Sequence, residues 1–149
     1  DNTVAFLVEP IQGEAGVIIP PPGYFKRVRT LCSERNVTLI LDEIQCGFGR
    51  TGTVFAYEQA GIEPDMMTVA KPMAGGLPMG AVLMTNSIAA AIAPGDHGTT
   101  FGGGPFVAHV ARHVVDRLSA PELLQHVRET GAWFGEQLHA LCARSPRVR

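Results

Sequence analysis

Two apolar segments of the chain end in ionisable side chains, and these side chains are the best suited to chemistry. Residues 39–41 lead into Asp42, and residues 66–70 lead into Lys71. Both segments are typical of buried strands, and α/β sheets bind ligands outside the carboxyl ends of their strands. Burial disfavours the charged form of an amine, and a neutral amine can attack a carbonyl to form a Schiff base. The pair therefore suits a cofactor that needs a carboxylate partner and an amine nucleophile, unless Lys71 instead reaches solvent.

A third apolar segment, residues 4–8, ends in Glu9. If its strand lies beside the strand of Asp42, Glu9 is placed to meet a substrate amine. Gln45 follows Asp42 by three residues and adds a neutral hydrogen-bonding group at the same edge. Glu14, in the long Gly/Pro-rich loop after Glu9, is expected to lie in solvent.

The segment GTTFGGGP places the hydroxyls of Thr99 and Thr100 beside glycines whose backbone N–H groups can approach an oxyanion. This composition suits a phosphate cradle. An ordinary glycine-rich turn before the helix that follows fits the composition equally well.

Two other patterns are formally present but lack the context that their chemistry requires. Gly47, Gly49 and Gly52 match G-x-G-x-x-G, yet DEIQC separates the first glycine from the strand, so a dinucleotide site is not favoured. His109 and His113 have the i, i+4 spacing of zinc ligands, but no third ligand lies nearby in the sequence, so we expect no metal.

The elements that would position these residues alternate in type along the chain. A strand at 4–8, a helix at 24–36 and a strand at 38–41 form a βαβ unit, which implies parallel pairing. A short helix at 54–60, strands at 66–70 and 81–84, a helical turn capped by Ser87, and helices at 106–118 and 122–143 complete the expected order. We therefore predict an α/β fold with a mostly parallel sheet flanked by helices.

The composition narrows the class of protein. The 149 residues, 46% of them hydrophobic, can form a packed core. The net charge of −2 shows no excess of basic residues, so nucleic acid is not expected as a partner. No apolar run is long enough to span a membrane. Three widely spaced cysteines indicate a reducing compartment, the cytoplasm. The abrupt start on a strand and the basic tail RSPRVR suggest a piece of a longer protein.

Three segments in order, VEPIQGEAGVIIPP, LILDEIQCGFGRTGTVFAYEQAGIEPDMMTVAK and PGDHGTTFGGGP, resemble the class III pyridoxal-phosphate aminotransferases, most of all the acetylornithine and ornithine types. The similarity extends to about Leu118. It implies a fold-type-I large domain, with residues 1–118 forming its C-terminal half and 119–149 a helix leading into the small domain. It also implies a homodimer that transfers the amino group of N-acetylornithine or ornithine to 2-oxoglutarate, as in arginine biosynthesis.

The resemblance also implies a role for each candidate residue toward pyridoxal 5'-phosphate. Lys71 would be the imine-forming lysine and the catalytic base. Asp42 would keep the pyridine nitrogen protonated, and Gln45 would contact the phenolic oxygen. Such a carboxylate makes the ring an electron sink.

Other positions would contact the phosphate and the substrate. Thr100 would reach the phosphate bound by the neighbouring subunit, with Thr99 near the substrate. Glu9 would pair with a substrate-binding arginine and help to select the reacting amine.

The sequence departs from the family pattern at three positions, where Pro72 follows the lysine, Gly104 replaces an asparagine, and Cys46 replaces a small hydroxyl residue. Three alternatives remain open. The chain could come from another class III transaminase, acting on 4-aminobutyrate, succinylornithine or a diamine. It could be an inactive fragment that serves as an interaction module. A nicotinamide-dependent oxidoreductase built on the glycine match is the third.

Overall fold

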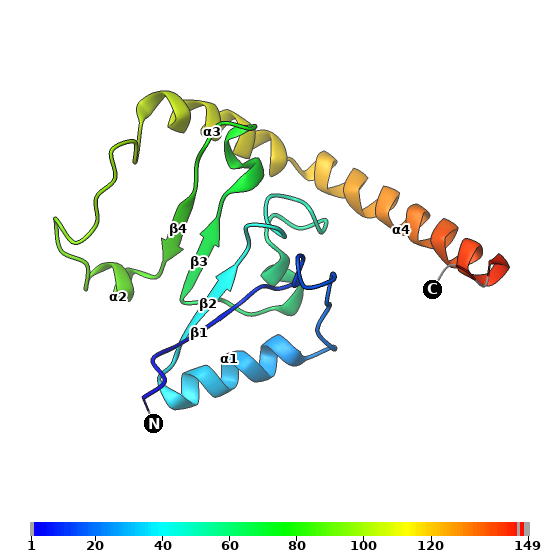
Figure 1. The fold of residues 1–149 in the computed structure, drawn as a ribbon, viewed down its shortest axis with the longest axis horizontal. Helices are drawn as coiled ribbons and strands as arrows, with labels where there is room; N and C mark the ends of the chain where they lie inside the picture. The colour runs from blue at the N-terminus through cyan, green and yellow to red at the C-terminus, as the bar shows by residue number, and fades with distance from the viewer. Residues whose placement is uncertain (1, 146, 148–149) are drawn as a thin grey trace.

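The fold is seen in a computed structural model that describes residues 2–145 and 147 (Figure 1). Its elements in chain order are β1 (Ala5–Val8), α1 (Tyr24–Arg35), β2 (Thr38–Asp42), the 3-10 helix η1 (Ala56–Ala60), β3 (Met66–Val69), the 3-10 helix η2 (Lys71–Ala74), β4 (Ala81–Met84), α2 (Asn86–Ala89), α3 (Pro105–Leu118) and α4 (Pro121–Arg144). Part of the basic tail RSPRVR lies outside the described residues.

The four strands form one sheet in the order β1-β2-β3-β4. β1 pairs with β2 and β2 with β3 in parallel, whereas β3 and β4 are antiparallel. The helix α1 connects β1 to β2 as the predicted crossover, and it runs alongside these strands in Figure 1. The predicted α/β fold with a mostly parallel sheet is therefore confirmed.

One face of the sheet carries the core. Leu39 and Leu41 of β2 are fully buried against Phe25 and Cys32 of α1. A second cluster places Met67 and Val69 of β3 with Phe48, against residues of α3. These side chains share a face because successive side chains of a strand alternate between faces.

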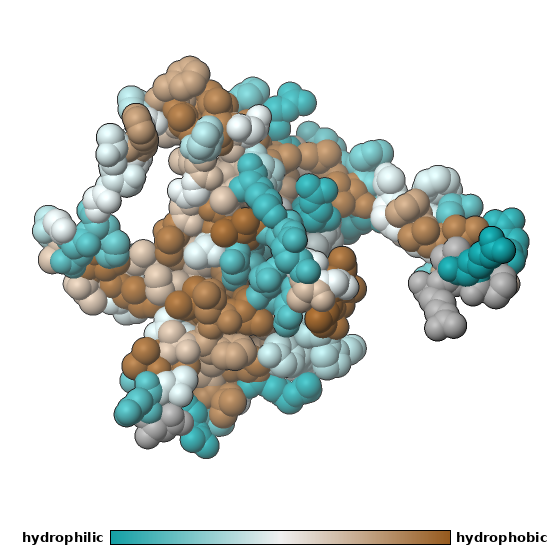
Figure 2. Space-filling model, viewed as in Figure 1, coloured by the Kyte–Doolittle hydropathy of each residue, from teal (hydrophilic) through white to brown (hydrophobic). Residues whose placement is uncertain are grey.

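The opposite face is largely open in the part of the chain that the structure describes. Leu7 and Val82, which alternate with the core residues, are 62% and 51% exposed. Figure 2 shows apolar surface over the sheet region and a mostly separate, extended α4. Asp42 and Thr68 are paired in register on this open face.

Several predicted boundaries differ from the structure. The short helix α2 is capped by Thr85, not by Ser87, which lies inside it as its second residue. Thr85 takes the cap position because it follows β4 directly with extended backbone, and its hydroxyl lies 3.0 Å from that of Ser87. The helices α3 and α4 each begin one residue earlier than predicted, at a proline that suits the first helical position.

The remaining difference concerns Lys71. The strand β3 ends at Val69, so Lys71 begins η2 and does not end a strand. The short helix predicted at 54–60 is the 3-10 helix η1, and Gly61 ends it in the left-handed conformation.

Asp65 joins three elements at the amino edge of β3. Its Oδ2 accepts hydrogen bonds from Nη1 of Arg29 on α1 and from the backbone N–H of Leu39 on β2, both at 2.7 Å. Its carbonyl accepts the N–H of Thr85, which follows β4. One carboxylate thus fixes the crossover helix to the sheet.

Replacing this carboxylate should destabilise the fold. We expect Asp65→Asn to lower the free energy of unfolding by about 1.5–3 kcal/mol, the usual contribution of hydrogen bonds to a charged group. Urea denaturation of the full-length protein would measure it, with Glu34→Gln on the exposed side of α1 as the control. An Asp65→Asn midpoint equal to that of wild type would contradict this role.

Candidate active site

Lys71 occupies a strained turn at the carboxyl end of β3. Its φ is 28°, in a region that residues other than glycine rarely adopt, and Pro72 follows it. A proline disfavours the helical conformation in the residue before it, and η2 then begins with the hydrogen bond from Met73 N–H to the carbonyl of Ala70. Strained residues of this kind cost about 1–3 kcal/mol and cluster at functional sites.

The Lys71 side chain is exposed, so the expectation of a buried amine is wrong for the described chain. The reason is the shorter β3: two residues beyond the strand, the chain has already turned away from the core.

Gln45 and Lys71 line the same cavity, of about 280 Å³. Gln45 comes from the turn after β2 and Lys71 from η2. The α3–α4 junction supplies the apolar wall through Leu118 and Leu123. The structure thus brings together two of the residues predicted for chemistry.

Asp42 and Glu9 form a second pair. Asp42 ends β2, half-buried, and its Oδ1 accepts the N–H of Ile44 at 3.0 Å. It lines a hollow with Glu9, which directly follows β1. Because β1, β2 and β3 run parallel, both pairs lie at the carboxyl edge of the sheet, although Asp42 and Lys71 line different cavities.

An unpaired hydroxyl lies beside Asp42. Thr68 is the register partner of Asp42 on β3, and its Oγ1 is buried without a hydrogen-bond partner among the described residues. Buried polar atoms are nearly always hydrogen-bonded. This orphaned hydroxyl on the open face is consistent with a polar group binding next to Asp42.

The loop after Glu9 folds back onto the turn after β2. Glu9 Oε2 accepts the N–H of Gly13 at 3.1 Å, and Nε2 of Gln45 donates to Oε1 of Glu14 at 3.0 Å. Glu14 is exposed, as expected, but it contacts a site residue, which the sequence did not predict.

Thr99 and Thr100 lie apart from these residues. Both are exposed on the loop between α2 and α3, and Thr99 lines a separate hollow together with Phe101 and the neighbouring glycines. Within one chain, the structure does not bring them to Lys71.

The glycine-rich loop that matches a dinucleotide fingerprint packs against helices. A Cβ on Gly49 would lie 3.2 Å from the carbonyl oxygen of Leu118, and a side chain on Gly52 would collide with Arg128 of α4. Nη1 of Arg128 donates to the carbonyl of Gly52. Close helix packing thus explains these glycines without a dinucleotide.

Glu43 is a structural residue of the site, and its role was not evident from the sequence. It is 1% exposed, and its two oxygens accept the N–H groups of Ala56 and Tyr57, at 3.0 and 2.8 Å. Its own backbone N–H donates to the carbonyl of Thr68, and its carbonyl accepts the N–H of Gly47. Glu43 therefore fixes the turn that presents Asp42 and Gln45. The sequence shows that an acidic residue follows the strand, but it does not show that the first N–H groups of η1 lie within hydrogen-bond distance of it.

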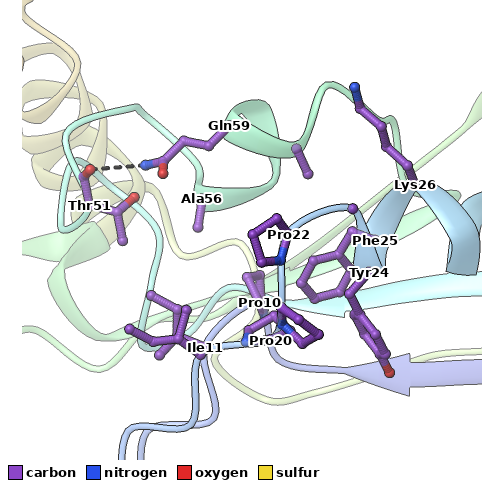
Figure 3. Close-up of a pocket in the computed structure, with 14 residues that line it drawn as sticks. Pro10, Ile11, Pro20, Pro22, Tyr24, Phe25, Lys26, Thr51, Ala56 and Gln59 are labelled. Carbon is purple, nitrogen blue, oxygen red and sulfur yellow. Dashed lines mark hydrogen bonds between the residues drawn. The ribbon is translucent and has the colours of Figure 1, made fainter.

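The largest of the cavities described lies elsewhere. It measures about 440 Å³ and is lined by proline and aromatic residues of the 10–25 segment, with Lys26 and Gln59 at its rim (Figure 3). None of the residues predicted for chemistry line it, and it has no carboxylate.

The structure offers no metal site among the residues it describes, in that no three His, Cys, Asp or Glu side chains gather suitably. His109 and His113 are both exposed on α3. All three cysteines are free. Within the described ranges, no helix has the length and apolar character needed to cross a bilayer.

Burial should make Glu43 a source of pH-dependent stability. Desolvation raises the pKa of Glu43 above its ordinary value of 4.5 despite the hydrogen bonds from Ala56 and Tyr57. A raised carboxyl pKa favours folding below the unfolded value, and this contribution is lost as the pH rises through the folded value. The stability of wild type relative to Glu43→Gln should therefore be greatest below pH 4.5 and decline as the pH rises above it toward neutrality. Urea titrations across this range test it, and a difference that grows with pH would contradict it.

Comparison with known proteins finds relatives in the family that the sequence motifs resemble, and the similarity covers the full sequence. The family model for class III aminotransferases matches residues 1–149. An ornithine aminotransferase of Bordetella pertussis is 53% identical over 99% of the chain, and an acetylornithine aminotransferase of Methanothermobacter thermautotrophicus is 50% identical over 100%. The chain spans 36% and 38% of these two relatives, a little more than a third of their length.

Solved structures agree. The acetylornithine aminotransferase of Elizabethkingia anophelis matches 95% of the chain with a TM-score of 0.90 and 40% identity, and the chain covers 37% of it. The ornithine δ-aminotransferase of Plasmodium falciparum matches 92% with a TM-score of 0.88 and 38% identity, with 36% of its own chain covered. The resemblance seen in the sequence motifs is confirmed: the chain belongs to the class III aminotransferase family.

Proposed function

We propose that this chain forms part of the active site of a pyridoxal-phosphate-dependent aminotransferase. Its substrates are N-acetylornithine or ornithine as amino donor and 2-oxoglutarate as acceptor. The observation that supports it most is that the cavity of Gln45 and Lys71 and the separate hollow of Asp42 and Glu9 both lie at the carboxyl edge of the parallel strands. In α/β proteins this edge is where ligands bind.

The residues present fit the cofactor. Asp42 offers a carboxylate for the pyridine nitrogen, and Thr68 next to it has a buried hydroxyl in need of a partner. The amide of Gln45 can donate to the phenolic oxygen, and the amine of Lys71 can bind the aldehyde covalently. When bound, the cofactor withdraws electrons from the substrate carbon and so makes its proton removable.

The protein's part in the reaction is to hold this proton and orient the donor. Lys71 would accept the proton at Nζ and return it, as a general base and then a general acid. Its exposure and its position on a strained turn leave the amine accessible from the cavity. The carboxylate of Asp42 would keep the ring nitrogen protonated, and Glu9 would select which amine of the donor approaches.

Thr99 and Thr100 fit a shared site in a homodimer. They lie exposed on a loop away from Lys71 of their own chain, as residues that serve a neighbouring subunit would. The proposed assembly is a cytoplasmic homodimer in which Thr100 contacts the phosphate of the partner's cofactor. Residues 1–118 would belong to the large domain and 119–149 would lead into the small one.

Removing the amine should abolish turnover. We expect Lys71→Ala in the full-length protein to lower kcat by at least about 10²–10⁴-fold, the contribution of a positioned acid–base group. Borohydride treatment of wild type with pyridoxal phosphate should leave a stable adduct that peptide mass spectrometry locates on Lys71. Lys26→Ala, which removes another exposed amine, on α1, is the matched control and should keep both activity and adduct.

An adduct on a different lysine would refute the assigned role of Lys71. A panel of donors with 2-oxoglutarate, containing ornithine, N-acetylornithine, succinylornithine, 4-aminobutyrate and a diamine, would identify the substrate. The highest kcat/KM is expected for one of the first two.

A further inference from the structure

The side chain of Gln45 is held by an acceptor that the proposed chemistry does not use. Its Nε2 donates to Oε1 of Glu14 at 3.0 Å across 31 residues of sequence. A carboxylate can only accept hydrogen bonds, so the nitrogen end of the amide must face Glu14. The same nitrogen carries a second N–H, which remains free to donate to another acceptor.

The turn that carries Glu14 is itself well fixed. Gln12 and Ile18 pair across it through two backbone hydrogen bonds of 3.0 Å, and the carbonyl of Gly13 accepts the N–H groups of Gly16 and Val17. Val17 has a φ of 56°, an uncommon value for a β-branched residue. The 12–18 turn therefore keeps a defined shape despite its exposure.

This turn is packed against the segment that holds Gln45. A Cβ on Gly13 would lie 3.4 Å from both Cγ and Nε2 of Gln45, so the turn closely approaches that side chain. The next residue, Cys46, directs its Sγ to the carbonyl of Ile11 at 3.5 Å. Gly13 N–H also donates to Glu9. One turn thus connects the predicted substrate acid with the predicted cofactor amide.

We propose that Glu14 is a positioning residue, which turns the Gln45 amide so that its second N–H points to the phenolic oxygen of the cofactor. The proposal rests on the proposed function and deepens it. Without Glu14 the amide can rotate and present its carbonyl oxygen, which would repel a negatively charged oxygen. The length of the glutamate matters, because its oxygen must reach from the turn to the amide.

A double-mutant cycle in the full-length protein tests the proposal. The variants are Glu14→Ala, Gln45→Ala and the double variant, with Glu14→Gln as the conservative replacement and Glu34→Ala on α1 as the matched control. Three properties are measured: the urea midpoint of the cofactor-free protein, the dissociation constant for pyridoxal phosphate, and the pH midpoint of the bound cofactor's absorbance as a spectroscopic signature.

We expect Glu14→Ala to weaken cofactor binding by about 3–10-fold, as loss of one hydrogen bond does, and to shift the absorbance midpoint. Glu14→Gln retains an oxygen acceptor and should restore most of the affinity. In the Gln45→Ala background, Glu14→Ala should have almost no further effect on either binding or the urea midpoint, because its partner is gone. Glu34→Ala should behave as wild type.

Equal losses in both backgrounds would overturn the proposal, since Glu14 would then act independently of Gln45. Unchanged binding in Glu14→Ala would overturn it as well. In either case the proposed function survives if wild type still forms the Lys71 adduct. If wild type forms no adduct, the proposed function fails and this inference fails with it.

Discussion

The parallel pairing of β2 with both neighbours is the constraint on which the site depends. Backbone hydrogen bonds set Val8 opposite Leu41, and Leu41 opposite Met67. This register brings the ends of three strands to one edge, so the residues after them, far apart in sequence, become neighbours. A shift of one residue would exchange the faces of Asp42 and Glu43 and bury the wrong carboxylate.

Asp42 and Glu43 are adjacent in the sequence, but they have different roles because successive side chains along a strand point to opposite faces of the sheet. Asp42 points to the open face, half-buried, where a ligand can reach it, whereas Glu43 points into the covered side and binds the first N–H groups of η1. One residue of sequence separates a group available for chemistry from a group that holds the turn in shape. The carboxyl group of Glu43 forms no ion pair in the described structure, and the two N–H donors offset only part of the cost of its burial.

The sequence predicted the secondary structure well where the hydrophobic periodicity was regular and where glycine or proline marked the ends of the elements. The apolar strand segments, the helical pattern at 24–36 and the two long helical patterns at 106–118 and 122–143 predicted a mostly parallel sheet flanked by helices. Their motifs also identified the family. The β3 boundary was missed because Ala70 continues the apolar pattern, although the Ala70–Lys71 turn before Pro72 ends the strand.

Contacts between segments distant in the sequence were beyond prediction. No pattern of residues could show that Glu14 would meet Gln45, since that contact depends on how the 12–18 turn folds back over the sheet edge. The same limit applies to Arg128, whose bond to Gly52 crosses 76 residues. Both contacts involve glycines whose role is to let another segment approach closely, a role that composition does not distinguish from a flexible loop.

The hydrogen bond from Arg128 to Gly52 attaches α4 to the loop after β2. The first half of α4 is docked on the loop that follows Gln45, because Gly49 and Gly52 leave room for Leu124 and Arg128. The second half extends away from the sheet with Trp133, Phe134 and Leu138 exposed (Figure 1). In the described chain, α4 thus contacts the loop that follows the turn fixed by Glu43. Leu123 and Val127 of its first half line the cavity of Gln45 and Lys71, so the start of α4 forms part of the wall of the site.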